Sequence, residues 1–335
     1  MKPAARILLT VALAACSTPN VTPGGAPTSL QTKAARQTAA AADLFVENYN
    51  DITEYSSTGK LVRTITKAIP KKGMNAGGIA FDSQGYLYAI TGLTSVAVYA
   101  PSSRKLARSL TSGIAWPISI DVDSHDNLYV GNEQNDTVSV FPSGQSEPAR
   151  TISKGIKDPV ALAFDSAGDL YVANLFGNSV TVYSPSGKLM RSITQGIRGP
   201  QAIVLDANDQ LFVGNTHFGN GRTVTVYSAG GDTPIATIER GIHGPAWLAL
   251  TSSSQLWVSD ENDASATLYS GAGWNLAQTI ADISLPGPVL VDSKNDLYVE
   301  CCAPQINVYP AGSDKPSLTI TQGITSVRAM ALGPP

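Results

Sequence analysis

A short motif returns seven times along the chain, at intervals of 41 to 45 residues. It consists of Leu, an aromatic residue and Val or Ala. Its copies begin at Leu44, Leu87, Leu128, Leu170, Leu211, Leu256 and Leu297. A fixed period means that one supersecondary unit stacks on copies of itself, so the period constrains the fold more than local propensity does. The 335 residues therefore favour one repeat architecture over two separate domains.

The unit is clearest between residues 156 and 197. The apolar run Val160–Phe164 ends in an Asp-Ser-Ala-Gly-Asp turn, and Leu170–Val172 follows. Val180–Tyr183 alternates with the two-residue period of a half-buried strand, and the more polar Arg191–Thr194 ends the unit. Four antiparallel strands in about 42 residues are typical of a propeller blade. We expect the first strand to line the centre and the fourth to form the outer edge.

The two ends of the repeat region complement each other. The first copy, Leu44–Thr66, has only strands two to four, and Arg328–Leu332 matches the missing first strand. Pairing that last strand with the N-terminal three closes the ring and hides a sheet edge that would otherwise be exposed. A six-bladed ring with an unpaired partial copy is the alternative. We therefore predict an all-β, seven-bladed β-propeller over residues 44–335.

The repeat also resembles known families. Its unit contains Gly-x-x-x-Pro, then Ile-Ala-Phe-Asp, Gly-x-Leu-Tyr-Val-Ala-Asn and Val-x-Val-Tyr, best seen in Ile156–Ile197. This pattern resembles NHL-repeat propellers and the related surface-layer type with Tyr-Val-Thr-Asn repeats, over essentially Leu44–Leu332. The resemblance implies the fold and leaves the activity open, because such propellers include binding scaffolds, lactonases and lyases.

The N-terminus is typical of a targeting segment. Lys2 and Arg6 precede an apolar stretch, Ile7–Ala14, that is far shorter than the roughly 20 residues of a spanning helix. Leu13–Cys16 resembles the bacterial lipobox, which implies cleavage before Cys16 and lipidation of its sulfur. An ordinary signal peptide is the alternative. We expect a signal peptide at 1–15 and a lipid-anchored Cys with a flexible, disordered tether at 16–43.

These features predict a location and exclude one class of partner. A lipoprotein of this kind is expected in the bacterial cell envelope, on the periplasmic or outer face, and at the outer membrane if the cell is Gram-negative. The membrane contact would run only through the anchor. The net charge of −3 argues against a nucleic-acid binder, which needs a basic face. We expect a monomer.

Residues after the Leu-aromatic-Val motif are expected to ring one mouth of the propeller channel. Blade topology puts the loops between strands two and three on the same face as the loops between blades. The predicted ligand-binding residues are Asn48, Asn132, Asn174, Asn215 and Asp260. Asn and Asp at such turns also bond their own backbone, which is the alternative interpretation.

Acidic residues gather in three consecutive blades of the closed ring. Glu47, Asp260 and Glu300 are the predicted metal ligands, and their oxygen atoms suit Ca²⁺ or another divalent cation. Gluconolactonase-like propellers hold a divalent metal near the same mouth, so the resemblance permits a lactonase. Acidic side chains that are merely solvated are the alternative.

Two histidines belong to loops of this face. Streptogramin lyase, another propeller, uses a His with a nearby Glu, and the resemblance implies that His217 or His243 with Glu261 would be the catalytic residues here. A lone surface His is more often solvated. His125 is expected on the opposite face.

Adjacent cysteines stand where other blades carry the Asn. Cys301 and Cys302 are candidates for a strained vicinal disulfide in an oxidising compartment, and two thiols without that bond are the alternative.

The function predicted first is a lipid-anchored binding module for a protein, peptide or glycan. The alternative is an enzyme, either a metal-assisted, lactonase-like hydrolase or a lyase, with its site at the mouth. A purely structural display scaffold is the third hypothesis.

Overall fold

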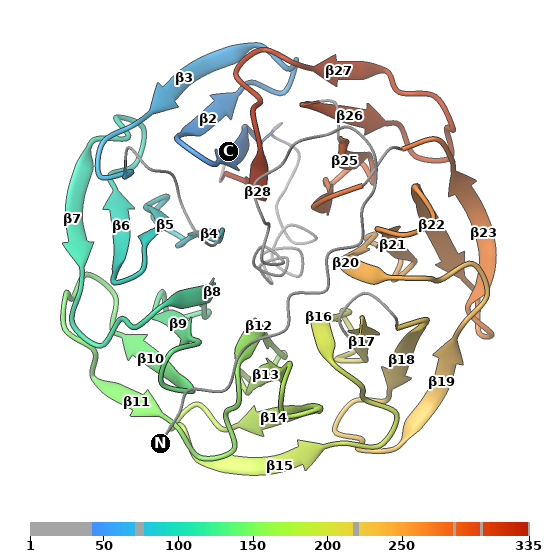
Figure 1. Cartoon of the computed structure of the whole chain (residues 1–335), viewed down its shortest axis with the longest axis horizontal. Coiled ribbons are helices and arrows are strands. Elements are labelled where there is room, and N and C mark those ends of the chain that lie inside the picture. The colour runs from blue at the N-terminus through green and yellow to red at the C-terminus, as the bar shows by residue number, and fades with distance from the viewer. Residues whose placement is uncertain (1–41, 71–76, 217–220, 284–285, 302–303, 334–335) are drawn as a thin grey trace, which may run out of the picture.

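The computed structural model describes residues 42–70, 77–216, 221–283, 286–301 and 304–333. These residues form seven four-stranded antiparallel sheets arranged around a central axis like the blades of a propeller (Figure 1). The prediction of seven blades is confirmed, and the six-bladed alternative is wrong. Within the described residues, no helix is long and apolar enough to span a bilayer.

The innermost strand of each blade faces the central axis and is buried along most of its length. Four of these strands begin with Pro, at a position where the missing N–H removes no ladder bond. The innermost strands are β28 (Val327–Leu332), β4 (Ile79–Phe81), β8 (Pro117–Val122), β12 (Pro159–Phe164), β16 (Pro200–Leu205), β20 (Pro245–Leu250) and β24 (Val289–Val291).

The second strand carries the repeated Leu-aromatic-Val motif. Almost all of its residues are buried, because both faces of the strand pack against neighbouring blades. The second strands are β1 (Leu44–Asn48), β5 (Leu87–Gly92), β9 (Leu128–Asn132), β13 (Leu170–Asn174), β17 (Leu211–Asn215), β21 (Leu256–Asp260) and β25 (Leu297–Cys301).

The third strand is held to a loop by its Tyr. The Tyr183 hydroxyl donates to the Lys154 carbonyl oxygen at 2.7 Å, and Tyr55, Tyr99, Tyr227 and Tyr269 make the equivalent bond in their blades. The third strands are β2 (Ile52–Tyr55), β6 (Ser95–Tyr99), β10 (Thr137–Phe141), β14 (Ser179–Tyr183), β18 (Thr223–Tyr227), β22 (Ser265–Ser270) and β26 (Gln305–Tyr309).

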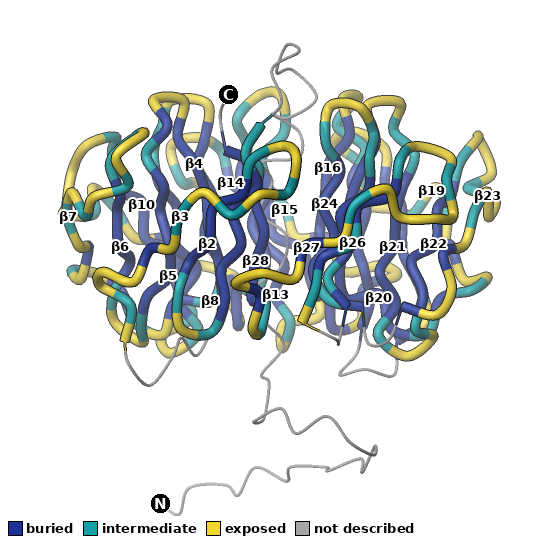
Figure 2. The backbone as a smooth tube through the Cα atoms, turned by 90° about the horizontal axis from the view of Figure 1, so that it is seen from above, coloured by how far each residue is buried: buried dark blue, intermediate teal, exposed yellow. Residues whose placement is uncertain are grey.

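The fourth strand forms the outer wall of the ring. Exposed and partly buried residues alternate along it, as expected for a strand with one solvated face (Figure 2). The fourth strands are β3 (Leu61–Ile65), β7 (Leu106–Leu110), β11 (Arg150–Ile152), β15 (Leu189–Ile193), β19 (Pro234–Ile238), β23 (Asn275–Ile280) and β27 (Leu318–Ile320).

The hydrophobic core lies between blades. Val180 and Val182 of β14 belong to the same buried cluster as Ile203 and Leu205 of β16. Apolar side chains on both faces of each sheet are therefore covered by the next blade, which explains why a chain with only 15% charged residues can fold as one ring.

Blade 1 closes the ring with strands from both ends of the chain. β28 pairs antiparallel with β1, with Leu332 opposite Leu44 and Ala329 opposite Glu47. Blade 1 is thus β28-β1-β2-β3, and blades 2 to 7 contain β4–β7, β8–β11, β12–β15, β16–β19, β20–β23 and β24–β27. The predicted closure by a C-terminal strand is confirmed.

One face of the ring collects two sets of loops. Each second strand ends on the face where its blade begins its third strand, and the connections between blades reach the same face. We call this face the mouth. The turns between first and second strands lie on the opposite face.

Candidate functional site

The Asn residues at the ends of the second strands are buried and hydrogen-bonded inside the protein. In blade 4, Asn174 Oδ1 accepts the Lys157 N–H at 2.9 Å, and its Nδ2 donates to Thr181 Oγ1 at 2.9 Å. The same Oδ1 contact to the incoming loop recurs at 2.9–3.1 Å in Asn48, Asn132 and Asn215. These side chains fasten loops to strands, so the structure supports the alternative in which they bond backbone. Ligand binding by them stays a prediction.

Blade 6 has Asp260 where those four blades have Asn. Its Oδ2 accepts the His243 N–H at 2.5 Å, which keeps the loop contact, and its Oδ1 accepts the N–H groups of Asn262 and Asp263. The side chain is fully buried, and none of the ion pairs among the described residues involves it. Burial raises the pKa of Asp260, while the backbone donors act in the opposite direction. The exchange therefore places a buried carboxyl group, with no cationic partner, at the mouth.

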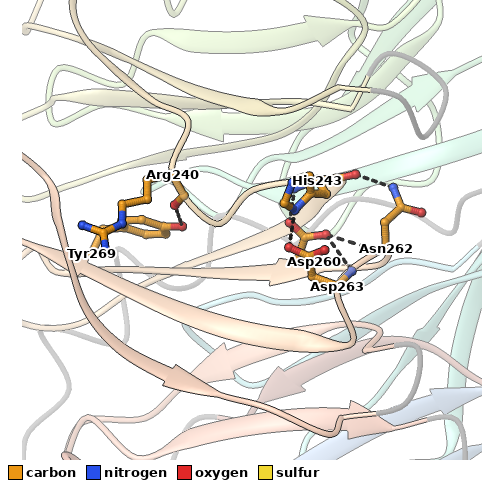
Figure 3. Close-up of polar contacts among 6 residues, drawn as sticks. All are labelled: Arg240, His243, Asp260, Asn262, Asp263 and Tyr269. Carbon is orange, nitrogen blue, oxygen red and sulfur yellow. Dashed lines mark hydrogen bonds and ion pairs between the residues drawn. The ribbon is translucent and has the colours of Figure 1, made fainter.

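His243 is fixed next to this carboxyl group. Besides the backbone bond to Asp260, its carbonyl oxygen accepts the Asn262 Nδ2–H, and its ring Nδ1 contacts Asp263 Oδ2 (Figure 3). The side chains of His243 and Asp263 are 39% and 35% exposed. Both groups thus face solvent in a defined geometry. Figure 3 also shows the Arg240 side chain beside Tyr269, away from this cluster.

His243, Asp260 and Asp263 have the geometry of a metal-binding group. One potential ligand atom from each residue lies within 4.8 Å of the others. We call these three residues the blade-6 cluster. It is the single group of three or more His, Cys, Asp or Glu side chains within such distances in the part of the chain that the structure describes.

Glu47 and Glu300 do not join Asp260. Glu47 turns toward blade 2, where its Oε2 accepts the Gly78 N–H at 2.5 Å. Glu300 lies over Gly287 of its own blade, so close that a Cβ at that position would clash with the Glu300 carboxylate. Burial raises the pKa of each glutamate to about 8. The structure therefore keeps one of the three predicted metal ligands, Asp260, in a metal-like cluster and leaves the other two apart from it.

Of the two remaining predicted catalytic residues, Glu261 lies next to the blade-6 cluster and His217 lies outside the described residues. Glu261 is partly buried, its pKa is raised by burial and then by the Asp260 charge, and its N–H donates to the Gly244 carbonyl oxygen. The carboxylate that contacts the His243 ring is Asp263 rather than Glu261. His217 lies outside the described residues, so its predicted role is untested.

The cysteine predictions stay predictions. Cys301 is buried in β25, and the Asn307 Nδ2–H donates to its Sγ at 3.4 Å. Cys302 and Cys16 lie outside the described residues, so neither the vicinal disulfide nor the lipid anchor is tested.

Sequence reasoning missed an apolar part of the mouth. Leu93, in the loop between β5 and β6, and Trp116, in the loop before β8, are 42% and 40% exposed. The Trp116 N–H donates to the Leu93 carbonyl oxygen at 2.7 Å, so the two loops are joined. Trp116 has φ of 51°, a left-handed conformation taken by Asp158 and Gly199 at the same position in the next two blades. A bulky residue there is unusual, and that departure from the repeat was the available signal.

Comparisons with known proteins support the fold. The chain is similar to the structure of hydrazine synthase from Kuenenia stuttgartiensis, with a TM-score of 0.60 and 18% identity over 69% of this chain and 75% of that one. It is equally similar to virginiamycin B lyase from Staphylococcus aureus, with a TM-score of 0.60 and 13% identity over 69% of this chain and 80% of that one. At these identities the likeness extends to the propeller fold and not to activity. No protein-family model and no curated protein sequence matches the chain.

Proposed function

We propose that the protein is a lipid-anchored extracytoplasmic propeller that binds a protein, peptide or glycan at its mouth. The observation that carries the proposal is the blade-6 cluster, which presents a histidine and a carboxylate to solvent on the face where loops from all blades meet. Polar groups fixed in position lose little entropy when a ligand binds, so they are effective anchors.

The apolar part of the mouth supports the same proposal. Leu93 and Trp116 expose apolar surface on the mouth, although large apolar side chains are usually buried. This surface is available for contact with a ligand. An aromatic ring of this kind packs against a sugar face or an apolar peptide side chain. The left-handed backbone at Trp116 is shared by Asp158 and Gly199 at the same position, so what distinguishes this blade is the exposed indole ring that the turn carries.

The path of the chain fits an anchored receptor. β1 starts at Leu44 on the face opposite the mouth and ends at Asn48 on the mouth. The segment that precedes Leu44 therefore joins the ring on the opposite face. With Cys16 lipidated, the anchor would reach the ring from the face opposite the mouth and would leave the mouth loops free of the attachment point.

Glycan and peptide arrays test the proposal. The purified wild-type protein, Trp116→Ala and His243→Ala would be compared with His125→Ala, which changes an exposed residue in a first-to-second-strand turn on the opposite face. We expect some array components to bind the wild type and His125→Ala equally well. The two mouth variants should bind the same components at least tenfold more weakly. Binding that survives both mouth substitutions would contradict the proposal.

Cys16→Ser is expected to move the protein from the membrane fraction to the soluble fraction.

A hydrolase or lyase is the second candidate. It is favoured by the contact between His243 Nδ1 and Asp263, because a carboxylate on one ring nitrogen leaves Nε2 to take a proton from a substrate. Turnover of a lactone panel or of a cyclic depsipeptide that His243→Ala abolishes would support it. Equal turnover by both proteins would exclude His243 as the base.

A further inference from the structure

The blade-6 cluster combines ligand types that discriminate between metals. It offers one imidazole nitrogen and two carboxylate groups. Ca²⁺ prefers oxygen ligands alone, whereas Zn²⁺ and similar transition metals accept imidazole together with carboxylate. The donor set therefore differs from the all-oxygen site that the sequence suggested.

The donor atoms lie near one another but not yet at coordination distances. Ligand atoms on a tetrahedral zinc at about 2.0–2.2 Å are about 3.3–3.6 Å apart. The three donor atoms lie within 4.8 Å of one another, so binding requires the half-exposed His243 and Asp263 side chains to adjust. An ion would replace the direct contact between His243 Nδ1 and Asp263 Oδ2.

Charge provides an independent indication. Four other blades use a neutral Asn at the position of Asp260, and the loop contact that Asn provides is still made in blade 6. A neutral Asn would keep this one contact, but the second oxygen of Asp260 also accepts the Asn262 and Asp263 N–H groups, which an amide nitrogen cannot do. The Asp260 carboxylate is fully buried, its three hydrogen bonds come from backbone N–H groups, and it has no cationic partner among the described residues, so a nearby cation would be favourable. A divalent cation supplies the missing positive charge.

We propose that His243, Asp260 and Asp263 form a binding site for a divalent transition metal ion of the Zn²⁺ class at the mouth of blade 6. Three protein ligands leave a coordination position open. Because His243 and Asp263 are the exposed members, the open position faces the mouth. The site stands independently of the proposed binding function, since it needs no ligand other than the ion.

Isothermal titration of the purified protein with Zn²⁺ tests the site, using protein without a histidine tag that has been dialysed against chelator. We expect one Zn²⁺ per chain and a rise in melting temperature with Zn²⁺ but not with equimolar Ca²⁺. His243→Ala and Asp263→Asn should each weaken the affinity at least about tenfold.

Two variants make the test specific. Asp260→Asn installs the residue that blades 1, 3, 4 and 5 carry and keeps the contact to the His243 N–H, so it should fold and lose Zn²⁺ binding. Without metal it should melt somewhat below the wild type, because the Asn262 and Asp263 N–H groups lose an acceptor. Cys301→Ser removes a thiol that would itself attract zinc and should leave the affinity unchanged.

Absence of Zn²⁺ binding to the wild type would overturn the inference. So would unchanged affinity in Asp260→Asn, or loss of binding in Cys301→Ser alone. Array binding that continues in the presence of chelator would leave the proposed binding function intact while the metal site fails, so the two outcomes are distinguishable.

Discussion

Asn174 illustrates how one buried amide fixes a loop. Its oxygen accepts from the Lys157 backbone and its nitrogen donates to Thr181, so a single side chain joins the loop entering blade 4 to two of its strands. The residue is typical of a ligand-binding collar in the sequence, but its exposed fraction is zero. Sequence pattern places a residue near the mouth without showing whether its side chain turns inward.

Replacing this amide should cost stability. Asn174→Ala is expected to lower the free energy of unfolding by about 2–3 kcal/mol, because it leaves a loop N–H and a buried hydroxyl without this partner. Urea unfolding of Asn174→Ala and of the exposed control Asn208→Ala measures the effect, and the control should change by less than about 0.5 kcal/mol. Unchanged stability together with lost ligand binding would show that Asn174 belongs to a binding site instead.

Glu47 makes stability depend on pH. Its Oε1 is buried without a hydrogen-bond partner among the described residues, and burial raises its pKa from the ordinary 4.5 to about 8. The folded protein therefore holds this proton more tightly than the unfolded chain. The associated stability is complete below pH 4.5 and is lost as the pH rises through about 8.

Glu47→Gln should flatten this dependence. Between pH 5 and pH 9 the wild type should lose a few kcal/mol of unfolding free energy that Glu47→Gln retains, as an order of magnitude. Chemical unfolding at several pH values measures it. Parallel pH profiles for the two proteins would mean that Glu47 is not buried as described.

At the scale of elements, the strands follow directly from the repeat. The alternation in Val180–Tyr183, the apolar first strands and the polar fourth strands predicted their places in the blade. The loops were harder, because their conformation depends on contacts with other blades. Asp263 reaches His243 only because the loop after β21 curls back toward the preceding connection, 20 residues earlier in the chain. No local propensity encodes such a contact.

The Tyr at the end of the third strand is hydrogen-bonded to the connection that enters its blade. Tyr183→Phe removes the hydrogen bond to the Lys154 carbonyl and should cost about 1 kcal/mol in unfolding free energy. Blade 3 already has Phe141 at this position, so the ring itself is tolerated. The reverse change, Phe141→Tyr, is a matched control for packing. A Tyr183→Phe protein as stable as the wild type would show that the bond contributes nothing.

At the scale of the whole molecule, closure determines whether the ring holds together. β28 covers the inner edge of β1, and the paired strands bury Met330 and Ala331. This closure was predictable because the N-terminal copy lacks one strand and the C-terminal remnant supplies it. Which blade would carry a functional cluster was less predictable, since acidic residues occur in three neighbouring blades and sequence does not show which side chains converge.

Removal of the last strand tests closure. A chain ending at residue 326 should lose cooperative unfolding and associate through the exposed edge of β1. A chain lacking only residues 334 and 335 is the control. Size-exclusion chromatography and thermal unfolding compare them, and a monomeric, cooperatively folding truncated chain would contradict a ring held by β28.

The central claim is that the functional centre of this ring is the mouth of blade 6. Anomalous diffraction above the zinc absorption edge, from crystals of the protein grown with Zn²⁺, tests it most directly. We expect a peak within about 2.0–2.2 Å of ligand atoms from His243, Asp260 and Asp263, and no such peak in Asp260→Asn crystals. A wild-type crystal with no peak at these residues, or with zinc bound elsewhere on the ring, would contradict a metal site in blade 6.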